Sequence, residues 1–159
     1  MTTTIHHQIA INATPEQVWL VLADLDRLAD YDPVVTKSVV IGQTHEGLGA
    51  RRRCDARQGR FFVEDVTVWE PPHKLQFAIV ECNLPTTGLS HGYVLELTAA
   101  GTTVSETLAY DIRFGVVGRV LDRVIVRGKT EQGIRGFLAG LKATVEQSQP
   151  PRSNDASAQ

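Results

Sequence analysis

Residues 34–113 are dominated by runs of β-branched and aromatic side chains, separated by short segments that carry glycine or proline. Runs of this kind, bounded by turn residues, are typical of antiparallel strands joined by hairpins. A further run, TIHHQIAI, lies near the N-terminus. The pattern therefore predicts seven strands, at residues 4–11, 34–42, 49–56, 60–69, 74–82, 88–98 and 102–112.

Two short helical segments and one long helix are predicted between and after these strands. Thr14, Pro15 and Glu16 supply a capping hydroxyl, a proline in the first turn and an early carboxylate, which together mark a helix start. Aspartates and a proline interrupt this helix, so a second short helical turn is expected over residues 25–31. Apolar residues recur at helical spacing over residues 115–147 and predict one long terminal helix.

This order of elements predicts an α+β fold in which a seven-stranded antiparallel sheet wraps around the long C-terminal helix. The two short helices after the first strand are expected to close the end that the long helix leaves open. The chain has 159 residues, of which 42% are hydrophobic, enough for one domain with a substantial core. We expect that domain to span residues 1–147 and the polar segment 148–159 to be a disordered tail.

The charge balance argues against several classes of partner. Lys plus Arg number 16 and Asp plus Glu number 18, so the formal net charge is −2, too weak a field to attract nucleic acid or an anionic membrane. Strand alternation also divides the three arginines at 51–53 between two faces. The chain contains no apolar run of the roughly 18 residues that a transmembrane segment needs, and its first residues lack the features of a signal peptide. We expect a cytoplasmic protein.

The spacing of cysteines and histidines does not suggest a metal site. Cys54 and Cys82 lie far apart without a CxxC motif, and the adjacent His6 and His7 point to opposite faces of a strand. The segment GLSHG matches the G-x-S-x-G pattern, but it leads into a strand rather than a helix, so Ser90 is not expected to be a nucleophile. We expect neither a metal nor an organic cofactor.

Five stretches of the sequence resemble the START-like superfamily, also called SRPBCC, in its branch of polyketide cyclase/dehydrase and lipid-transport proteins. They are INATPEQVWLVLADLDRLADYDPVV, GLGARRRCD, VEDVTVWEPPHKLQFAIVE, AAGTTVSETLAY and the glycine-containing terminal helix. The resemblance implies a helix-grip fold, a START-like ligand-binding domain with a deep apolar cavity between the curved sheet and the long helix. Because this superfamily hosts carriers, cyclases, dehydratases and regulators, the fold alone does not decide the function.

Strand alternation predicts which side chains line that cavity. The inward faces combine apolar bulk with a few polar groups. The predicted lining residues on strands are Arg52, Phe77, Ile79, His91, Tyr93, Leu95, Glu106, Leu108 and Tyr110, and those on the helical segments are Tyr31, Gly133 and Phe137. The strand at 60–69 offers apolar groups to both faces, so its inward face remains open at this stage.

Four of these residues, Arg52, His91, Tyr93 and Glu106, are also candidates for catalysis. A carboxylate on an apolar face is costly unless it is paired, so Glu106 is expected to have a partner, with Arg52 as the first candidate. Such a pair would orient a polar ligand or shift a pKa for proton transfer; the alternative is a purely structural pair. His91 and Tyr93 would act as acid and base in an enolising or dehydrating step; the alternative is an exposed histidine.

Three glycines, Gly133, Gly136 and Gly140, lie on one strip of the predicted terminal helix. Each glycine costs a helix about 1 kcal/mol relative to alanine, so the strip indicates that space is needed there. Two explanations stay open. Either the helix packs closely against the sheet, or the missing side chains leave volume for a ligand.

These observations lead to three hypotheses. The first is a monomeric or homodimeric bacterial protein that binds a small hydrophobic molecule, polyketide-like, aromatic or lipid-like, and no nucleic acid. The second is a polyketide cyclase or dehydratase acting by general acid/base catalysis in the same cavity. Aromatising cyclases of the superfamily often carry an arginine on the strand equivalent to 60–69, where this sequence has Asp65, which favours binding or a different reaction. The third is a regulatory or interaction protein on the same scaffold.

Overall fold

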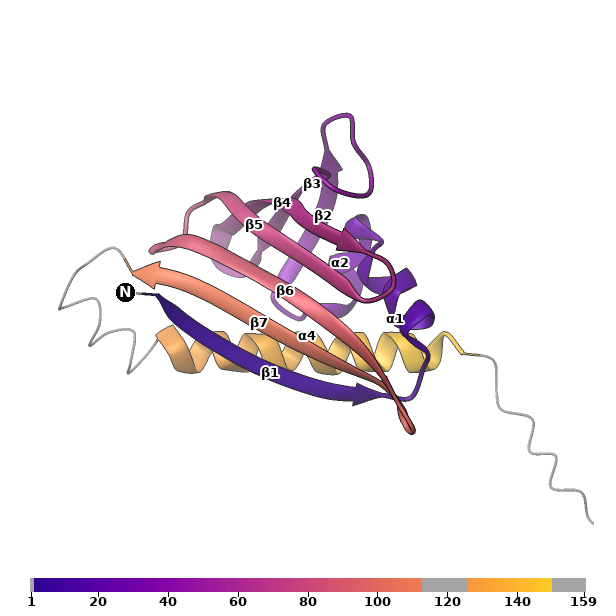
Figure 1. The fold of residues 1–159 in the computed structure, drawn as a ribbon. Helices are drawn as coiled ribbons and strands as arrows, with labels where there is room; N and C mark the ends of the chain where they lie inside the picture. Colours follow the sequence, from indigo (N-terminus) through magenta and orange to yellow (C-terminus); the bar gives the residue numbers. More distant parts are fainter. Residues whose placement is uncertain (1, 113–125, 150–159) are drawn as a thin grey trace, which may run out of the picture.

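A computed structural model, which describes residues 2–112 and 126–149, contains one antiparallel sheet of seven strands within those residues (Figure 1). The strands are β1 (Thr3–Ile11), β2 (Val35–Ile41), β3 (Arg51–Ala56), β4 (Arg60–Glu70), β5 (Lys74–Cys82), β6 (Thr86–Thr98) and β7 (Gly101–Ile112). Their order in the sheet is β1-β7-β6-β5-β4-β3-β2, so consecutive strands from β2 to β7 are neighbours and β1 pairs with β7. All seven predicted strands are confirmed, with ends that differ by a few residues.

The helical segments also follow the predicted order. They are α1 (Pro15–Leu22), the 3-10 turn η1 (Leu25–Arg27), α2 (Leu28–Tyr31), a second 3-10 turn η2 (Arg57–Gly59) and the long helix α4 (Arg127–Gln147). The part of the terminal helix that was expected before residue 126 falls on 113–125, outside the described residues. Most of the expected tail, residues 150–159, also lies outside them.

The start of α1 has the predicted cap. The backbone N–H of Gln17 donates to Oγ1 of Thr14 at 3.4 Å, and the backbone N–H of Thr14 donates to Oε1 of Gln17 at 2.9 Å. Pro15 occupies the first helical position, where its missing N–H is not needed. This reciprocal arrangement satisfies the exposed amide groups and fixes where the chain turns after β1.

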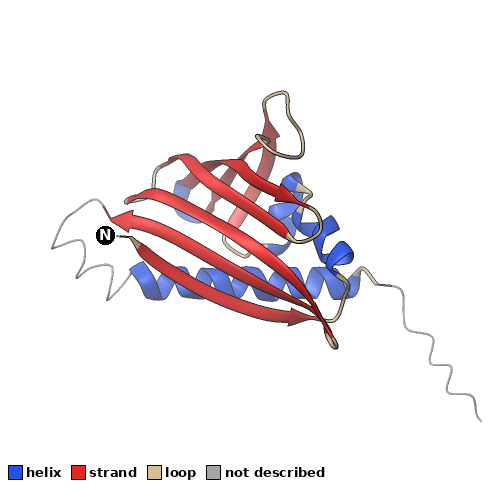
Figure 2. Cartoon of the chain, viewed as in Figure 1, coloured by secondary structure: helices blue, strands red, loops and turns tan. Residues whose placement is uncertain are grey.

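Helices α1, α2 and α4 lie on the same side of the sheet (Figure 2). The apolar side of α4 is buried against it through Ile134, Phe137, Leu138, Leu141 and Val145. In Figure 1, α4 runs along the curved sheet, and α1 and α2 lie near the C-terminal half of α4. This is the α+β helix-grip architecture that the sequence predicted.

The C-terminal half of α4 is tied to the end of β1. The backbone N–H of Asn12 donates to Oε1 of Glu146 at 2.9 Å, and Nζ of Lys142 donates to the carbonyl oxygen of Ala10 at 2.7 Å. Beyond the helix, Nε2 of Gln149 donates to the carbonyl oxygen of Asn12 at 2.6 Å. These bonds fix the position of α4 along the sheet.

The glycine strip of α4 has two different explanations along its length. A Cβ on Gly140 would overlap the backbone carbonyl group of Tyr31, and a Cβ on Gly136 would come within 2.9 Å of the side chain of Pro33. A Cβ on Gly133 would meet nothing within 4 Å. Close packing therefore accounts for Gly140 and Gly136. The expected neighbour was the sheet, but these glycines pack against the end of α2 and against Pro33 just beyond it, whereas Gly133 faces open space.

The short segments between β1 and β2 are held by polar contacts rather than by helix length. Oδ1 of Asp26 accepts the backbone N–H of Val40 on β2 at 2.6 Å, and Oγ of Ser38, also on β2, donates to the carbonyl oxygen of Leu25 at 2.6 Å. Asp26 is one of the aspartates that interrupt the helical pattern. The interruption thus attaches these short helices to the edge strand β2.

Candidate functional site

A buried ion pair joins β3 to β4 on the inner face of the sheet. Arg52 and Glu64 are cross-strand neighbours, and their side chains are 2% and 0% exposed. Nε of Arg52 donates to Oε1 of Glu64 at 2.5 Å, and Nη1 of Arg52 donates to the carbonyl oxygen of Leu25 at 3.4 Å. The guanidinium group lies 4.6 Å from the centre of the Phe77 ring. The pair is thus enclosed by the sheet and by the turn that follows α1.

The expected pairing of Arg52 with Glu106 is wrong, because Glu64 occupies the position next to Arg52. The hairpin register that pairs Ala56 with Arg60 also pairs Arg52 with Glu64. The apolar residues of β4 left its inward face undecided in the sequence, so this carboxylate was not predicted. The short ARQG turn between β3 and β4 was the signal that could have revealed it, since loop length fixes hairpin register.

Opposing effects set the pKa of Glu64. Burial raises the pKa of this carboxyl group, but the positive charge of Arg52 and the hydrogen bonds from Arg52 and His91 outweigh burial and lower it to about 2. For Arg52, burial lowers the pKa of the guanidinium, while the charge of Glu64 raises it, and the net change is upward. Both groups are therefore charged at neutral pH, and their charges balance.

His91 on β6 contacts the second oxygen of the same carboxylate. Nε2 of His91 lies 2.7 Å from Oε2 of Glu64, and the imidazole stacks on Phe77 with ring centres 5.0 Å apart. Because ionised Glu64 only accepts hydrogen bonds, the network assigns a hydrogen to Nε2. Nδ1 of His91 is buried and has no hydrogen-bond partner among the described residues. In the neutral imidazole this atom is an acceptor.

Glu106 on β7 lies on the same inner face, opposite Tyr93 on β6. Its side chain is buried, and Oε2 has no hydrogen-bond partner within residues 2–112 and 126–149. Burial, followed by the negative charges of Asp32 and Glu64, raises the pKa of the Glu106 carboxyl group to about 8. At neutral pH Glu106 is therefore mostly an uncharged carboxylic acid, which can donate a hydrogen bond.

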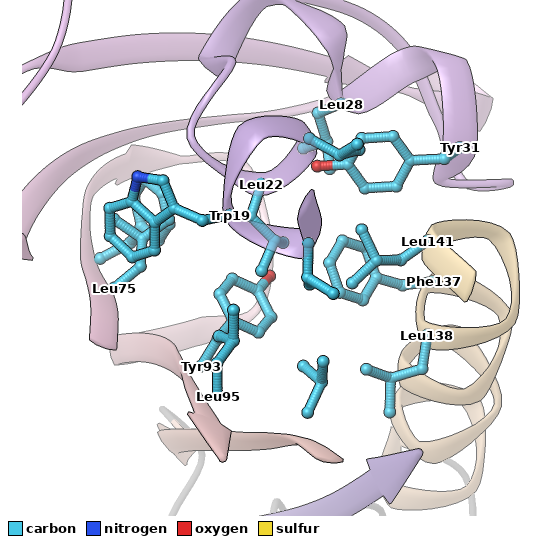
Figure 3. Close-up of a cluster of buried hydrophobic side chains, with 14 of the residues drawn as sticks. Trp19, Leu22, Leu28, Tyr31, Leu75, Tyr93, Leu95, Phe137, Leu138 and Leu141 are labelled. Atoms are coloured by element: carbon cyan, nitrogen blue, oxygen red, sulfur yellow. The ribbon is translucent and has the colours of Figure 1, made fainter. Parts of the chain in front are cut away.

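Aromatic rings lie between the polar side chains of the sheet, His91 and Glu106, and helix α4. Tyr93 and Phe137 stack with ring centres 5.2 Å apart, and Tyr31 lies tilted at 5.6 Å from Phe137. Figure 3 shows Tyr93 reaching from the sheet toward Phe137 on the helix, with Tyr31 on the α2 side of both. Burial raises the pKa of the Tyr93 and Tyr31 hydroxyl groups, so both stay neutral. The rings offer an apolar surface beside Glu106 and His91.

The remaining predicted lining residues differ in how deeply they are buried. Leu95 and Tyr110 are buried, while Ile79, Leu108 and Gly133 are partly buried. Asp65, compared above with the cyclase arginine, is on the outer face of β4, where it pairs with Arg51 at 2.5 Å. The inward carboxylate of β4 is therefore Glu64. A cavity among the lining residues stays a prediction.

Within residues 2–112 and 126–149, no group of three or more His, Cys, Asp or Glu residues is placed to hold a metal ion. Within the same residues, none of the helices has the length and apolar character required to span a membrane. Within the described residues, the inner face offers one buried ion pair, the unpartnered Nδ1 of His91 and the neutral carboxylic acid of Glu106.

Solved structures with the same fold cover almost the whole chain. The Zhui aromatase/cyclase from a Streptomyces species has a TM-score of 0.80 at 16% sequence identity, covering 92% of this chain and 95% of its own. A Thermus thermophilus protein has a TM-score of 0.79 at 22% identity, covering 93% and 100%. A START superfamily protein from Mycobacterium smegmatis has a TM-score of 0.74 at 14% identity, covering 92% and 99%. At such identities the likeness shows the fold alone.

No curated protein matches this sequence significantly. A family model does match it and identifies the family. Residues 2–146 match the family described as polyketide cyclase/dehydrase and lipid transport, a range that includes every strand, α1, α2 and nearly all of α4. This match agrees with the START-like resemblance of the sequence stretches and with the helix-grip fold. The chain therefore belongs to the polyketide cyclase/dehydrase and lipid transport family.

Proposed function

We propose that the protein binds a small hydrophobic ligand between the inner face of the sheet and α4. The observation that carries this proposal is the buried Oε2 atom of Glu106, which has no hydrogen-bond partner among the described residues. An unsatisfied polar atom in a protein interior costs about 1–3 kcal/mol, so it calls for an explanation such as an absent ligand or water. Membership of a family that includes lipid-transport proteins supports the proposal.

The side chains around Glu106 indicate what kind of ligand fits. Phe77, Tyr93 and Phe137 contribute aromatic rings, and Leu95 and Leu108 add aliphatic surface. Sites for small molecules typically combine mostly apolar walls with a few polar groups that orient the ligand. A polyketide-like, aromatic or lipid-like molecule matches this combination. A cavity for it, a cytoplasmic location and a monomeric or homodimeric state belong to the same proposal.

Binding of the neutral dye N-phenyl-1-naphthylamine tests the proposal, since its fluorescence rises in an apolar environment. Ile79 and Val80 make a matched pair on β5: Ile79 is opposite buried Glu64, whereas Val80 is 51% exposed. We expect the dye to bind the wild-type protein and Val80→Trp, but to bind Ile79→Trp much more weakly, because the added ring fills the interior. The absence of saturable dye binding, or equal binding by both variants, would contradict the proposal.

A second candidate function is proton-transfer catalysis, as in a cyclase or dehydratase. The observation in its favour is the contact of His91 with Glu64. This contact orients the imidazole and leaves Nδ1 free to accept a proton. The neutral carboxyl group of Glu106, on the neighbouring strand β7, can donate a proton. A structural relative is an aromatase/cyclase, which is consistent with this chemistry.

Hydrogen–deuterium exchange at the activated methylene group of a 1,3-diketone, followed by NMR, tests this second candidate. The wild-type protein should accelerate exchange above the protein-free rate, and His91→Gln should abolish the acceleration while dye binding persists. Equal acceleration by wild type and His91→Gln, or none by either, argues for a binding role alone.

A further inference from the structure

Two unpartnered polar atoms lie on neighbouring strands of the inner face. The β6–β7 register pairs His91 with Leu108 and Tyr93 with Glu106, so His91 and Glu106 are diagonal neighbours. Diagonal neighbours in an antiparallel sheet lie about 7–8 Å apart, and long side chains can approach each other over that distance. Nδ1 of His91 and Oε2 of Glu106 are both buried and lack partners within the described residues. One ligand group between these side chains can therefore contact both.

The two atoms have complementary hydrogen-bonding roles. The contact of Nε2 of His91 with the Glu64 carboxylate leaves Nδ1 as an acceptor in the neutral ring. The carboxyl group of Glu106, kept protonated by burial and by the charges of Asp32 and Glu64, is a donor. A hydroxyl group, which has one donor and two lone pairs, satisfies both at once. A carbonyl group lacks a hydrogen for His91, and a methyl group satisfies neither.

The charges around Glu106 disfavour an anionic ligand. Arg52 is the one buried Lys or Arg among the described residues, and Glu64 already balances its charge. Asp32 and Glu64 create a negative potential at Glu106, since their charges raise its pKa. A carboxylate or phosphate at this point would meet that potential without a free cation. An ammonium group would fit the potential, but it would lose its water in an apolar surrounding, and it has no lone pair to accept the hydrogen of Glu106.

We propose that the ligand is an aromatic alcohol, whose hydroxyl group accepts a hydrogen bond from the carboxyl group of Glu106 and donates one to Nδ1 of His91. Its ring packs on Tyr93 and Phe137, whose own rings stack at 5.2 Å. This inference rests on the proposed binding function and specifies the polar end of the ligand. It predicts selection against fatty acids and other anionic lipids.

Four naphthalene derivatives that differ in one group test the inference by displacement of N-phenyl-1-naphthylamine at about pH 7. They are 2-naphthylmethanol, 2-methylnaphthalene, 2-naphthoate and 2-naphthylmethylammonium. We expect the alcohol to bind about tenfold more tightly than each of the other three, the effect of one or two well-placed hydrogen bonds. In Glu106→Leu the alcohol and the methyl compound should bind alike. Glu106→Leu and Glu106→Gln both remove an unsatisfied buried carboxyl group, so both variants should fold.

The pH dependence supplies a second readout, because 2-naphthylmethanol does not titrate. The ionisable groups that share this interior with Glu106 come from every element around it. They are His7 on β1, His91 and Tyr93 on β6, Tyr110 on β7, Glu64 on β4, Arg52 on β3, and Tyr31 and Asp32 at the end of α2. Alcohol binding should weaken about tenfold between pH 7 and 9.5 as Glu106 loses its hydrogen. The amide of Glu106→Gln still donates but does not titrate, so this variant should bind the alcohol at both pH values. His7→Gln should behave like wild type.

The outcomes separate this inference from the proposed function. If the dye itself does not bind, the binding function fails and the inference with it. If the dye binds but the methyl compound, the naphthoate or the ammonium displaces it as well as the alcohol does, the binding function stands and the inference is overturned. Unchanged pH dependence in Glu106→Gln would also overturn it.

Discussion

Replacing Glu64 by glutamine tests the buried ion pair that organises the inner face. Glu64→Gln keeps the size of the side chain but removes its charge, so the guanidinium of Arg52 remains in the interior without a counter-ion. Both side chains are almost completely buried, and the pair has a short Nε–Oε1 distance of 2.5 Å. We expect a large loss of stability, because a buried cation is then uncompensated.

Two independent arguments give a similar magnitude for this loss. Removing one partner of a buried ion pair typically costs about 3–5 kcal/mol. The pKa of Glu64 falls from the usual 4.5 to about 2 on folding. By linkage, a shift of that size corresponds to roughly 3 kcal/mol of stability at neutral pH. Because the folded-state pKa is lowered, this contribution is complete above pH 4.5 and is lost as the pH falls toward 2.

Urea unfolding followed by circular dichroism measures the effect. With a urea dependence of about 2 kcal/mol per molar, a loss of 3 kcal/mol lowers the midpoint by about 1.5 M. Asp65→Asn is the matched control, since Asp65 is the next residue of β4 and pairs with Arg51 at the same 2.5 Å distance on the outer face. Water screens that exposed pair, so this control should change the midpoint little.

A double variant, Arg52→Met with Glu64→Leu, separates the cost of an unpaired charge from the value of the pair itself. Apolar replacements of both partners should restore most of the stability that Glu64→Gln loses, since no buried charge remains. Equal shifts of the urea midpoint in Glu64→Gln and Asp65→Asn would refute the reasoning. So would an acid-unfolding profile of Glu64→Gln that still shows the wild-type loss between pH 4.5 and 2.

Two further predictions concern Glu106 and the glycine strip. Folding raises the pKa of Glu106 from 4.5 to about 8, so wild-type stability should fall as the pH rises through this range; Glu106→Gln should equal wild type near pH 4.5 and exceed it by roughly 4 kcal/mol at pH 8 in urea unfolding. Equal pH profiles would contradict the neutral carboxylic acid. On α4, Gly133→Ala should stabilise the protein by up to about 1 kcal/mol, because its Cβ meets open space. Gly140→Ala should destabilise it by about 2 kcal/mol, because its Cβ overlaps the Tyr31 carbonyl group. Thermal unfolding that ranks the two alanine variants in the opposite order would show that helix propensity outweighs packing.

The fold was predictable because its signals are local. The Thr14 cap and the turn segments between strands each act over a few residues, and alternation within a strand assigns side chains to faces without knowledge of distant contacts. The family resemblance then supplied the three-dimensional arrangement of strands around the helix. The positions of Glu106 and Tyr93 on the inner face followed from alternation alone.

The electrostatics of the site were harder to predict, since they depend on which strands are neighbours and in what register. Alternation placed Arg52 and Glu106 on inner faces, but β3 and β7 are separated in the sheet by β4, β5 and β6. The partner of Arg52 had to come from β2 or β4. Had the strand order been combined with the hairpin register, Glu64 would have been the expected partner rather than Glu106.

The register of one hairpin therefore influences the chemistry of a residue three strands away. Because the β3–β4 hairpin sets Glu64 beside Arg52, the positive charge of Arg52 holds Glu64 as an anion. That anion orients His91 through Nε2, and it adds to burial and the charge of Asp32 in raising the pKa of Glu106. If Arg52 had instead paired with Glu106, the carboxyl group would have been ionised and could not have donated a hydrogen bond. The ion pair between β3 and β4 thus adds to the effect of burial and of Asp32 in keeping the donor on β7 uncharged. A variant that moves Glu64 should therefore change ligand preference at Glu106 without direct contact with it.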